Sequence, residues 1–226
     1  MQHKEKVALF DFCETIANFQ TADAYVKYVR DHYGNKRTRC IEKLRTLLSR
    51  TYILFALSIV FAKGSINKRM VLLQLKGYSI NVLEKYAKEY YECEIRPNLI
   101  HMVVNELIKL RDDGWKIVLV SAGYEIYLKY FAYEYNIQIE NVLSVRIKFK
   151  NGICYGTFDG GDRLWDKTEQ LDKKFDRSEI QSIAYSDSPS DLPLLLWAKD
   201  GVVVRRRDRN GEWYKNFNFR EIIWEK

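Results

Sequence analysis

Three strand-like runs in this chain each end beside a polar side chain that could serve as a metal ligand or a nucleophile. They are 7–10 before Asp11, 118–120 before Ser121, and 180–185 before Asp187. A carboxylate in such a place can be a metal ligand or a nucleophile, although a single one is often only a helix N-cap or a hydrogen-bonded loop residue. Together with Lys167, two carboxylates and a hydroxyl suit Mg²⁺, which prefers a few carboxylates and phosphate oxygens.

The elements that would position these residues alternate between strand and helix patterns. Short β-branched or aromatic runs predict strands at 7–10, 116–123, 142–149, 180–185 and 201–204. Helices are expected between them, one opened by Pro97, one over 165–175, and one with Ser188 as N-cap and Pro189 in its first turn. Asn151-Gly152 predicts a hairpin turn. The alternation predicts an α/β fold with a Rossmann-like parallel sheet flanked by helices. Right-handed crossovers bring the carboxyl ends of such strands to one edge, where ligands bind.

A long helical segment interrupts this alternation. From Thr21, a predicted N-cap, to about Arg96 the sequence has helical periodicity and no alternating strand. We therefore predict an α/β core over 1–18 and 97–226, and an inserted helical domain over 19–96. Residues 36–76 hold ten Lys or Arg and one acid, a net charge of +9, while the remainder holds 27 basic and 29 acidic residues, a net charge of −2. This charge would attract an anionic substrate or surface, or form a solvated helical face.

Inside the insertion, the eleven residues 52–62 carry no charge. This run is shorter than the ~20 residues that cross a bilayer. It is expected to form a buried helix, or to touch lipid through the basic residues that flank it.

Composition narrows the class of protein. With 226 residues, 47% of them hydrophobic, the chain can bury a sizeable core. The four cysteines lack the spacing of a zinc site or a disulfide framework, which favours a reducing cytoplasm, and the charged N-terminus lacks the pattern of a secretory signal. Arg205–Arg207 is too short a basic run to indicate nucleic-acid binding.

The order and strand context of these residues resemble the haloacid dehalogenase superfamily of phosphotransferases, over about residues 6–204. The resembling motifs are Asp11-Phe12-Cys13-Glu14-Thr15, Ser121, Lys167, and Ser186-Asp187-Ser188-Pro189-Ser190-Asp191. The resemblance places a helical cap of the C1 type between the first two motifs. The hairpin, Tyr155-Gly156-Thr157 and Ser186-Asp187-Ser188 look most like the phosphoserine-phosphatase-like subgroup.

The resemblance also implies a role for each motif residue. Asp11 would attack phosphorus and form an aspartyl phosphate, and Lys167 would neutralise charge between phosphate and nucleophile. Mg²⁺ would be held by Asp11, the backbone carbonyl of Cys13 and Asp187, with Asp191 binding it or supporting another ligand. The phosphate oxygens would be bound by the hydroxyl of Ser121 and the backbone N–H groups of Ala122 and Gly123, at a helix N-terminus.

The chain departs from the family pattern at two positions. Cys13 stands where family phosphatases carry the aspartate that protonates the leaving group and activates water. Three interpretations follow: a substrate whose leaving group needs little protonation, another acid such as Glu14 or a cap residue, or a protein that only binds phosphorylated ligands. Gln20 stands where phosphoserine enzymes place a carboxylate for the substrate ammonium, so L-phosphoserine is not expected as the substrate.

The sequence therefore predicts a cytoplasmic, Mg²⁺-dependent phosphatase or phosphotransferase that acts on a phosphorylated small metabolite. The alternatives are a catalytically impaired protein that binds phosphate ligands, and a membrane-surface protein whose basic, apolar cap docks on anionic lipid.

Overall fold

The computed structural model describes residues 4–51, 66–160, 166–209 and 211–225. Its centre is a six-stranded sheet in the order β3-β2-β1-β6-β7-β8, in which every neighbouring pair is parallel. The strands are β1 (Glu5–Phe10), β2 (Lys116–Tyr124), β3 (Val142–Val145), β6 (Ile180–Ser186), β7 (Asp200–Arg206) and β8 (Arg220–Trp224). This confirms the predicted α/β fold with a parallel sheet.

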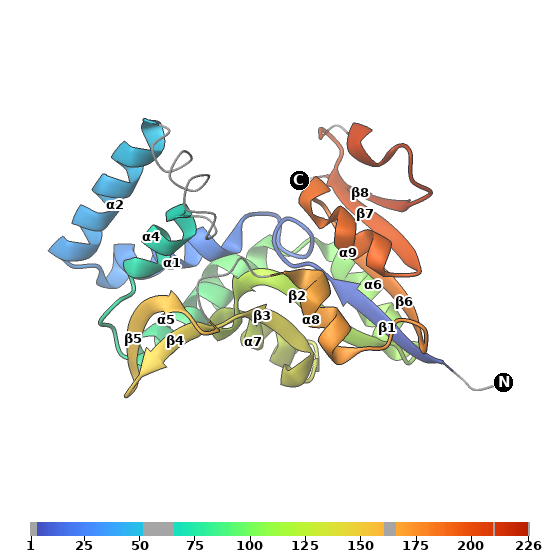
Figure 1. Ribbon diagram of the computed structural model, residues 1–226, viewed down its shortest axis with the longest axis horizontal. Coiled ribbons are helices and arrows are strands. Elements are labelled where there is room, and N and C mark those ends of the chain that lie inside the picture. Colours follow the sequence, from blue (N-terminus) through green and yellow to red (C-terminus); the bar gives the residue numbers. More distant parts are fainter. Residues whose placement is uncertain (1–3, 52–65, 161–165, 210, 226) are drawn as a thin grey trace.

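Helices cover both faces of the sheet (Figure 1). Alternate side chains of β1 pack against the helices of opposite faces. Val7 and Leu9 belong to one apolar cluster, with residues of α8 (Lys167–Lys174) and α9 (Leu192–Trp197). Ala8 and Phe10 belong to the other, with residues of α6 (His101–Asp112) and α7 (Glu125–Glu134). Successive side chains of a strand point to opposite faces, so the fully apolar run is buried on both sides.

The helical insertion lies between β1 and α6, as predicted. It consists of α1 (Thr21–Tyr33), α2 (Lys36–Arg50), α4 (Ile66–Leu73), α5 (Ile80–Tyr90), a π-helical segment (Tyr91–Ile95) and a 3₁₀ turn (Arg96–Asn98). Figure 1 shows α2 and α4 projecting from one end of the molecule, away from the sheet. The predicted domain limits at 19 and 96 stay a prediction. The apolar run 52–62 lies outside the described residues, and no described helix is long and apolar enough to cross a membrane.

The hairpin forms where Asn151-Gly152 predicts it, but as a separate two-stranded sheet. β4 (Ile147–Lys150) and β5 (Ile153–Phe158) are antiparallel, and both turn residues have positive φ, 51° and 74°. The single strand predicted over 142–149 is therefore wrong: the chain leaves the main sheet after Val145. The hairpin instead contacts the insertion, because the Cys154 carbonyl accepts a hydrogen bond from Gly77 N–H and the Cys154 N–H donates to the Tyr78 carbonyl.

Several helix boundaries differ from the prediction. Pro97 lies in the 3₁₀ turn, and α6 begins only at His101. The N-cap of α1 is Gln20 rather than Thr21, and α8 begins at Lys167, after the N-cap Asp166. The strand β8 was not predicted, because its five residues lie in a basic, aromatic tail with no strong alternation.

Candidate active site

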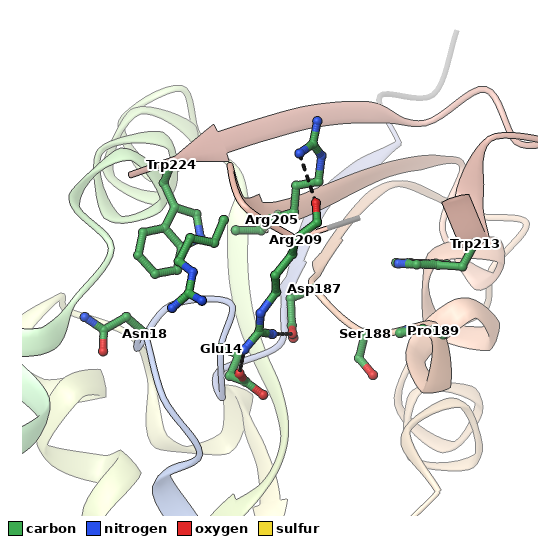
Figure 2. Close-up of a pocket in the computed structure, with 11 residues that line it drawn as sticks. Glu14, Asn18, Asp187, Ser188, Pro189, Arg205, Arg209, Trp213 and Trp224 are labelled. Atoms are coloured by element: carbon green, nitrogen blue, oxygen red, sulfur yellow. Dashed lines mark hydrogen bonds and ion pairs between the residues drawn. The ribbon is translucent and has the colours of Figure 1, made fainter. Parts of the chain in front are cut away.

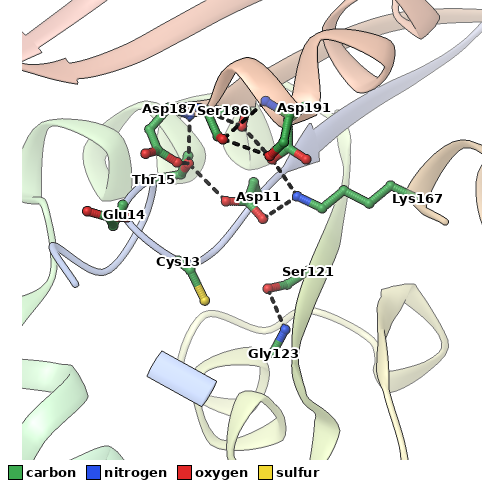
Figure 3. Close-up of polar contacts among 12 residues, drawn as sticks. Asp11, Cys13, Glu14, Thr15, Ser121, Gly123, Lys167, Ser186, Asp187 and Asp191 are labelled. Atoms are coloured by element: carbon green, nitrogen blue, oxygen red, sulfur yellow. Dashed lines mark hydrogen bonds and ion pairs between the residues drawn. The ribbon is translucent and has the colours of Figure 1, made fainter. Parts of the chain in front are cut away.

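The parallel sheet brings the predicted residues to one edge. Asp11 directly follows β1, Ser121 lies near the end of β2, and Asp187 directly follows β6. The backbone N–H of Asp11 continues the ladder by donating to the carbonyl of Tyr185 at 3.0 Å. Lys167, at the start of α8, reaches the same edge, and Figure 3 shows these side chains turned toward one another.

Lys167 links two buried carboxylates. Its Nζ lies 2.6 Å from Asp11 Oδ1 and 2.6 Å from Asp191 Oδ2. Burial alone would lower the pKa of Lys167, but the two carboxylates raise it above its ordinary value, so the ammonium stays charged. Asp191 Oδ2 also accepts a hydrogen bond from the Ser186 hydroxyl at 2.7 Å. Asp191 therefore positions the Lys167 ammonium beside Asp11.

Thr15 joins Asp11 to Asp187. Its hydroxyl lies 3.1 Å from Asp11 Oδ2 and 3.1 Å from Asp187 Oδ1, and it accepts from the N–H of Asp187 at 3.1 Å. The loop after β1 makes this possible by turning back on itself: Glu14 has a φ of 58°, and Ile16 N–H bonds the Phe12 carbonyl at 2.9 Å.

Burial raises the pKa of both carboxyl groups that Thr15 joins. For Asp11, Lys167 opposes this rise; for Asp187, the neighbouring Asp11 and Glu14 add to it and bring the pKa to about 7. A single Thr15 proton cannot serve both carboxylates. On the side away from Lys167, the half-exposed Arg209 lies 3.7 Å from Asp187 Oδ2, and the pKa of Asp187 stays raised despite this contact.

A divalent cation would offset the repulsion between the carboxylates of Asp11 and Asp187. Among the described residues no three His, Cys, Asp or Glu side chains form a metal-binding group. Asp11, Asp187 and a backbone carbonyl are nevertheless hard oxygen donors, and Mg²⁺ commonly uses one or two carboxylates with water and phosphate oxygens. The residues present fit Mg²⁺ in that form. Asp191 contacts Lys167 and Ser186 through Oδ2, and its part in metal binding stays a prediction.

Ser121 is fully buried and its hydroxyl oxygen accepts from the Gly123 N–H at 3.1 Å. The helix N-terminus expected at Ala122 and Gly123 lies further on, since β2 continues to Tyr124 and α7 begins at Glu125. Gly123 is required by close packing: an added Cβ would lie 2.5 Å from the Tyr127 hydroxyl oxygen.

Cys13 begins a chain of hydrogen bonds that ends in buried tyrosine. Its Sγ lies 3.0 Å from the Thr21 hydroxyl, which lies 2.8 Å from the Tyr127 hydroxyl. Burial and the nearby Asp11 raise the pKa of the Cys13 thiol. The thiol therefore stays protonated, and it is a weak acid and a weaker base.

Glu14 and Gln20 lie on the outer side of the loop. Gln20 Nε2 donates to Glu14 Oε2 at 2.5 Å, and Arg209 pairs with the other carboxylate oxygen. Partial burial opposes the shift, but these partners lower the pKa of Glu14. Glu14 is thus an ionised, paired carboxylate with no hydrogen bond to Asp11.

Four residues at this edge were not assigned a role in the site from the sequence. They are Thr15, Ser186, Thr21 and Arg209. Thr15 and Ser186 lie within the motifs, so their proximity to Asp11 and Asp187 was a usable signal. Thr21 and Arg209 meet the site only through the tertiary fold, and their local sequence carries no such signal.

We compared the sequence and the fold of this chain with those of known proteins. No curated protein matches the sequence. A protein of unknown function from Bordetella pertussis Tohama I has a TM-score of 0.76 at 17% identity, covering 97% of this chain and 98% of that one. A phosphoserine phosphohydrolase-like protein from Francisella tularensis has a TM-score of 0.64 at 17% identity, covering 96% and 94%.

A phosphoserine phosphatase solved as an analogue of its phospho-aspartyl intermediate has a TM-score of 0.58 at 18% identity, covering 96% of this chain and 93% of that one. At these identities the likenesses concern the fold. Residues 8–196 match the model of the haloacid dehalogenase-like hydrolases, a range that includes every predicted site residue. The chain belongs to the haloacid dehalogenase-like hydrolase family.

Proposed function

We propose that this hydrolase is a Mg²⁺-dependent phosphatase that acts on a phosphorylated small metabolite through an aspartyl phosphate on Asp11. The observation that carries the proposal is the pairing of Asp11 with Lys167 at 2.6 Å, at the edge that also holds Ser121 and Asp187. A carboxylate beside a charged ammonium can approach an anionic phosphate, because the ammonium offsets the repulsion between them.

Each side chain then has a separate task in phosphoryl transfer. Asp11 Oδ attacks phosphorus and the substrate oxygen leaves. Lys167 contacts both nucleophile and phosphate, while the Ser121 hydroxyl, oriented by Gly123, donates to a phosphate oxygen. Bound at Asp11, Asp187 and the Cys13 carbonyl, Mg²⁺ would stabilise negative charge on the phosphoryl group. Such positioning and charge stabilisation account for most of the catalysis in phosphoryl transfer.

This site lacks a good general acid to protonate the leaving group. The Cys13 thiol is held by Thr21 and has a raised pKa, and Glu14 is ionised and turned toward Gln20 and Arg209. We therefore infer a substrate whose leaving group needs little protonation, such as an activated phosphate or a phosphoramidate. The second step, attack of water on the aspartyl phosphate, lacks a good base for the same reason, so it is expected to be slow.

The structure also bears on the choice of substrate. Some of the similar structures are phosphoserine phosphatases. In this chain Gln20 donates its amide to Glu14, and it offers no carboxylate for a substrate ammonium. We infer that the metabolite differs from L-phosphoserine and that the helical insertion, rather than the α/β core, recognises its remainder.

The proposal is tested by hydrolysis of 4-nitrophenyl phosphate. Activity should disappear with EDTA and return with Mg²⁺, and Asp11→Asn should lower the rate by more than about 10³, because it removes the nucleophile. Circular dichroism of Asp11→Asn checks that the fold is kept. Unchanged turnover in the folded variant would remove this mechanism, and binding of phosphate without any turnover would instead support a phosphate-binding protein.

A further inference from the structure

A cavity of about 260 Å³ lies beside the candidate active site, where the connection from β7 to β8 faces the loop after β1 (Figure 2). Glu14 and Asp187 form part of its wall, so it shares these two residues with the site described above. The predicted nucleophile Asp11 and the phosphate-binding Ser121 are not among its lining residues. The cavity is therefore distinct from the place where phosphate would meet Asp11.

The rest of the wall is rich in hydrogen-bond donors. Arg206 and Arg209 line it with side chains that are 34% and 50% exposed. Arg206 pairs with Asp208, and Arg209 pairs with Glu14. A guanidinium has five N–H groups in a rigid fork, more than one carboxylate uses. Both arginines therefore keep N–H groups for a ligand in the cavity.

Trp224 adds a donor that has no acceptor. Its indole lines the cavity, only 8% of the residue is exposed, and Nε1 is buried without a hydrogen-bond partner among the described residues. Trp197 shows the usual situation, since its Nε1 donates to Asp172 at 2.7 Å. Buried indole N–H groups normally have a partner, so an unpaired one in a cavity wall indicates a missing acceptor. In Figure 2 the nitrogen of the Trp224 ring is on the side turned toward the other lining residues, and Trp213 lies across the cavity.

We propose that this cavity binds the oxyanion group of a small molecule, a phosphate, sulfate or carboxylate, as a second site separate from the reacting phosphate. Its oxygens would accept from the Trp224 Nε1–H and from the guanidinium forks of Arg206 and Arg209, which match such groups in shape and charge. The two indoles provide flat apolar walls for the remainder of the ligand.

Arg209 couples this second site to the candidate metal site. It is bonded to Glu14 and its Nη1 lies 3.7 Å from Asp187 Oδ2 (Figure 2). An anion that draws Arg209 away leaves Asp187 free for a cation, and a cation on Asp187 releases Arg209 for the anion. The two ligands should therefore strengthen each other's binding by the same factor. This coupling rests on the proposed metal role of Asp187, whereas the anion site itself does not.

The test is a sulfate titration followed by the indole signals in ¹H–¹⁵N spectra, where Trp224→Phe assigns the Trp224 signal. Sulfate should move the Trp224 indole proton downfield and saturably, while the Trp197 signal, already bonded to Asp172, stays in place. Sulfate also resembles the phosphate that Ser121 would bind, so the titration is repeated with Ser121→Ala, which should keep the Trp224 response. A Trp224 signal that does not respond in the folded protein, or that responds only while Ser121 is present, overturns the second site.

Two neighbouring arginines provide a matched pair of variants. Arg206→Gln removes a guanidinium group from the cavity wall. It should weaken sulfate binding at Trp224 at least about tenfold, because one charge-assisted hydrogen bond is lost. Arg207→Gln should not, because Arg207 is 74% exposed, pairs with Glu225 and lies outside the cavity wall. Equal weakening by both variants would overturn the site. With Mg²⁺ present sulfate affinity should rise, and Arg209→Gln should remove that rise; an unchanged affinity would overturn the coupling alone.

Discussion

At the scale of single residues, the account depends most on Cys13, which stands where the family resemblance implies an acid. The Cys13 thiol is half-buried and lies 3.0 Å from the Thr21 hydroxyl, and its pKa is raised, so it donates a proton poorly to an alkoxide. The rate of phosphoryl transfer to Asp11 should therefore fall steeply from nitrophenyl to alkyl phosphates.

Cys13→Asp should flatten this dependence on the leaving group. General acid catalysis is worth about 10²–10⁴ in rate, and the Thr21 hydroxyl is in place to hydrogen-bond the new carboxyl group. Single-turnover rates across a leaving-group series measure the slope, with Cys13→Ser as a control of similar size and thermal denaturation as the check on folding. If the folded Cys13→Asp protein keeps the parent slope, another residue already supplies the proton.

The raised pKa of Asp187 predicts that stabilisation by Mg²⁺ depends on pH. Its pKa of about 7 in the folded protein lies above the ~3.9 of an unfolded chain. Between these values the metal-free folded state holds the extra proton, so this group's contribution to stability falls as pH rises and is gone above about pH 7. Mg²⁺ competes with that proton. It should therefore raise the melting temperature more at about pH 8 than at about pH 5, and Asp187→Asn should abolish the difference. An equal gain at both pH values would speak against Asp187 as a ligand.

At the scale of elements, the end of β2 positions the Ser121 hydroxyl that we propose binds phosphate. Gly123→Ala would place a Cβ 2.5 Å from the Tyr127 hydroxyl and 3.3 Å from Ser121 Oγ, and Tyr127 is fully buried. The added methyl group should displace Ser121 and lower kcat/KM by about tenfold or more, as when a hydrogen bond to charge is lost. Tyr127→Phe makes room for it, so the double variant should recover part of the loss. A double variant as slow as Gly123→Ala would show that the contact is irrelevant.

The sequence predicted best those elements whose signal is local. The apolar run 7–10 and the Asn151-Gly152 turn are recognisable from residue type alone, and both occur as expected. The break after Val145 and the strand β8 were missed, because they depend on partners elsewhere: β8 forms by pairing Ile222 with Val204 of β7.

At the scale of the whole molecule, the candidate active site exists only in the folded chain. Asp11, Lys167 and Asp187 come from distant parts of the sequence, and the motif order with the parallel topology was enough to place them together. The contacts of Cys13 with Thr21, and of Arg209 with Asp187, were not predictable. They join the core to the helical insertion and to the C-terminal connection, whose relative position no local pattern records.

The central claim is that Asp11 becomes phosphorylated, and borohydride trapping tests it most directly. A reaction with 4-nitrophenyl phosphate and Mg²⁺ is quenched during turnover and treated with borohydride, which reduces an aspartyl phosphate to homoserine. Because Cys13 is a poor base for the attack of water, the intermediate should accumulate. Peptide mass spectrometry should find homoserine at position 11 in the parent protein and none in Asp11→Asn. Steady turnover with no homoserine at position 11, or with reduction at another aspartate, would contradict the mechanism.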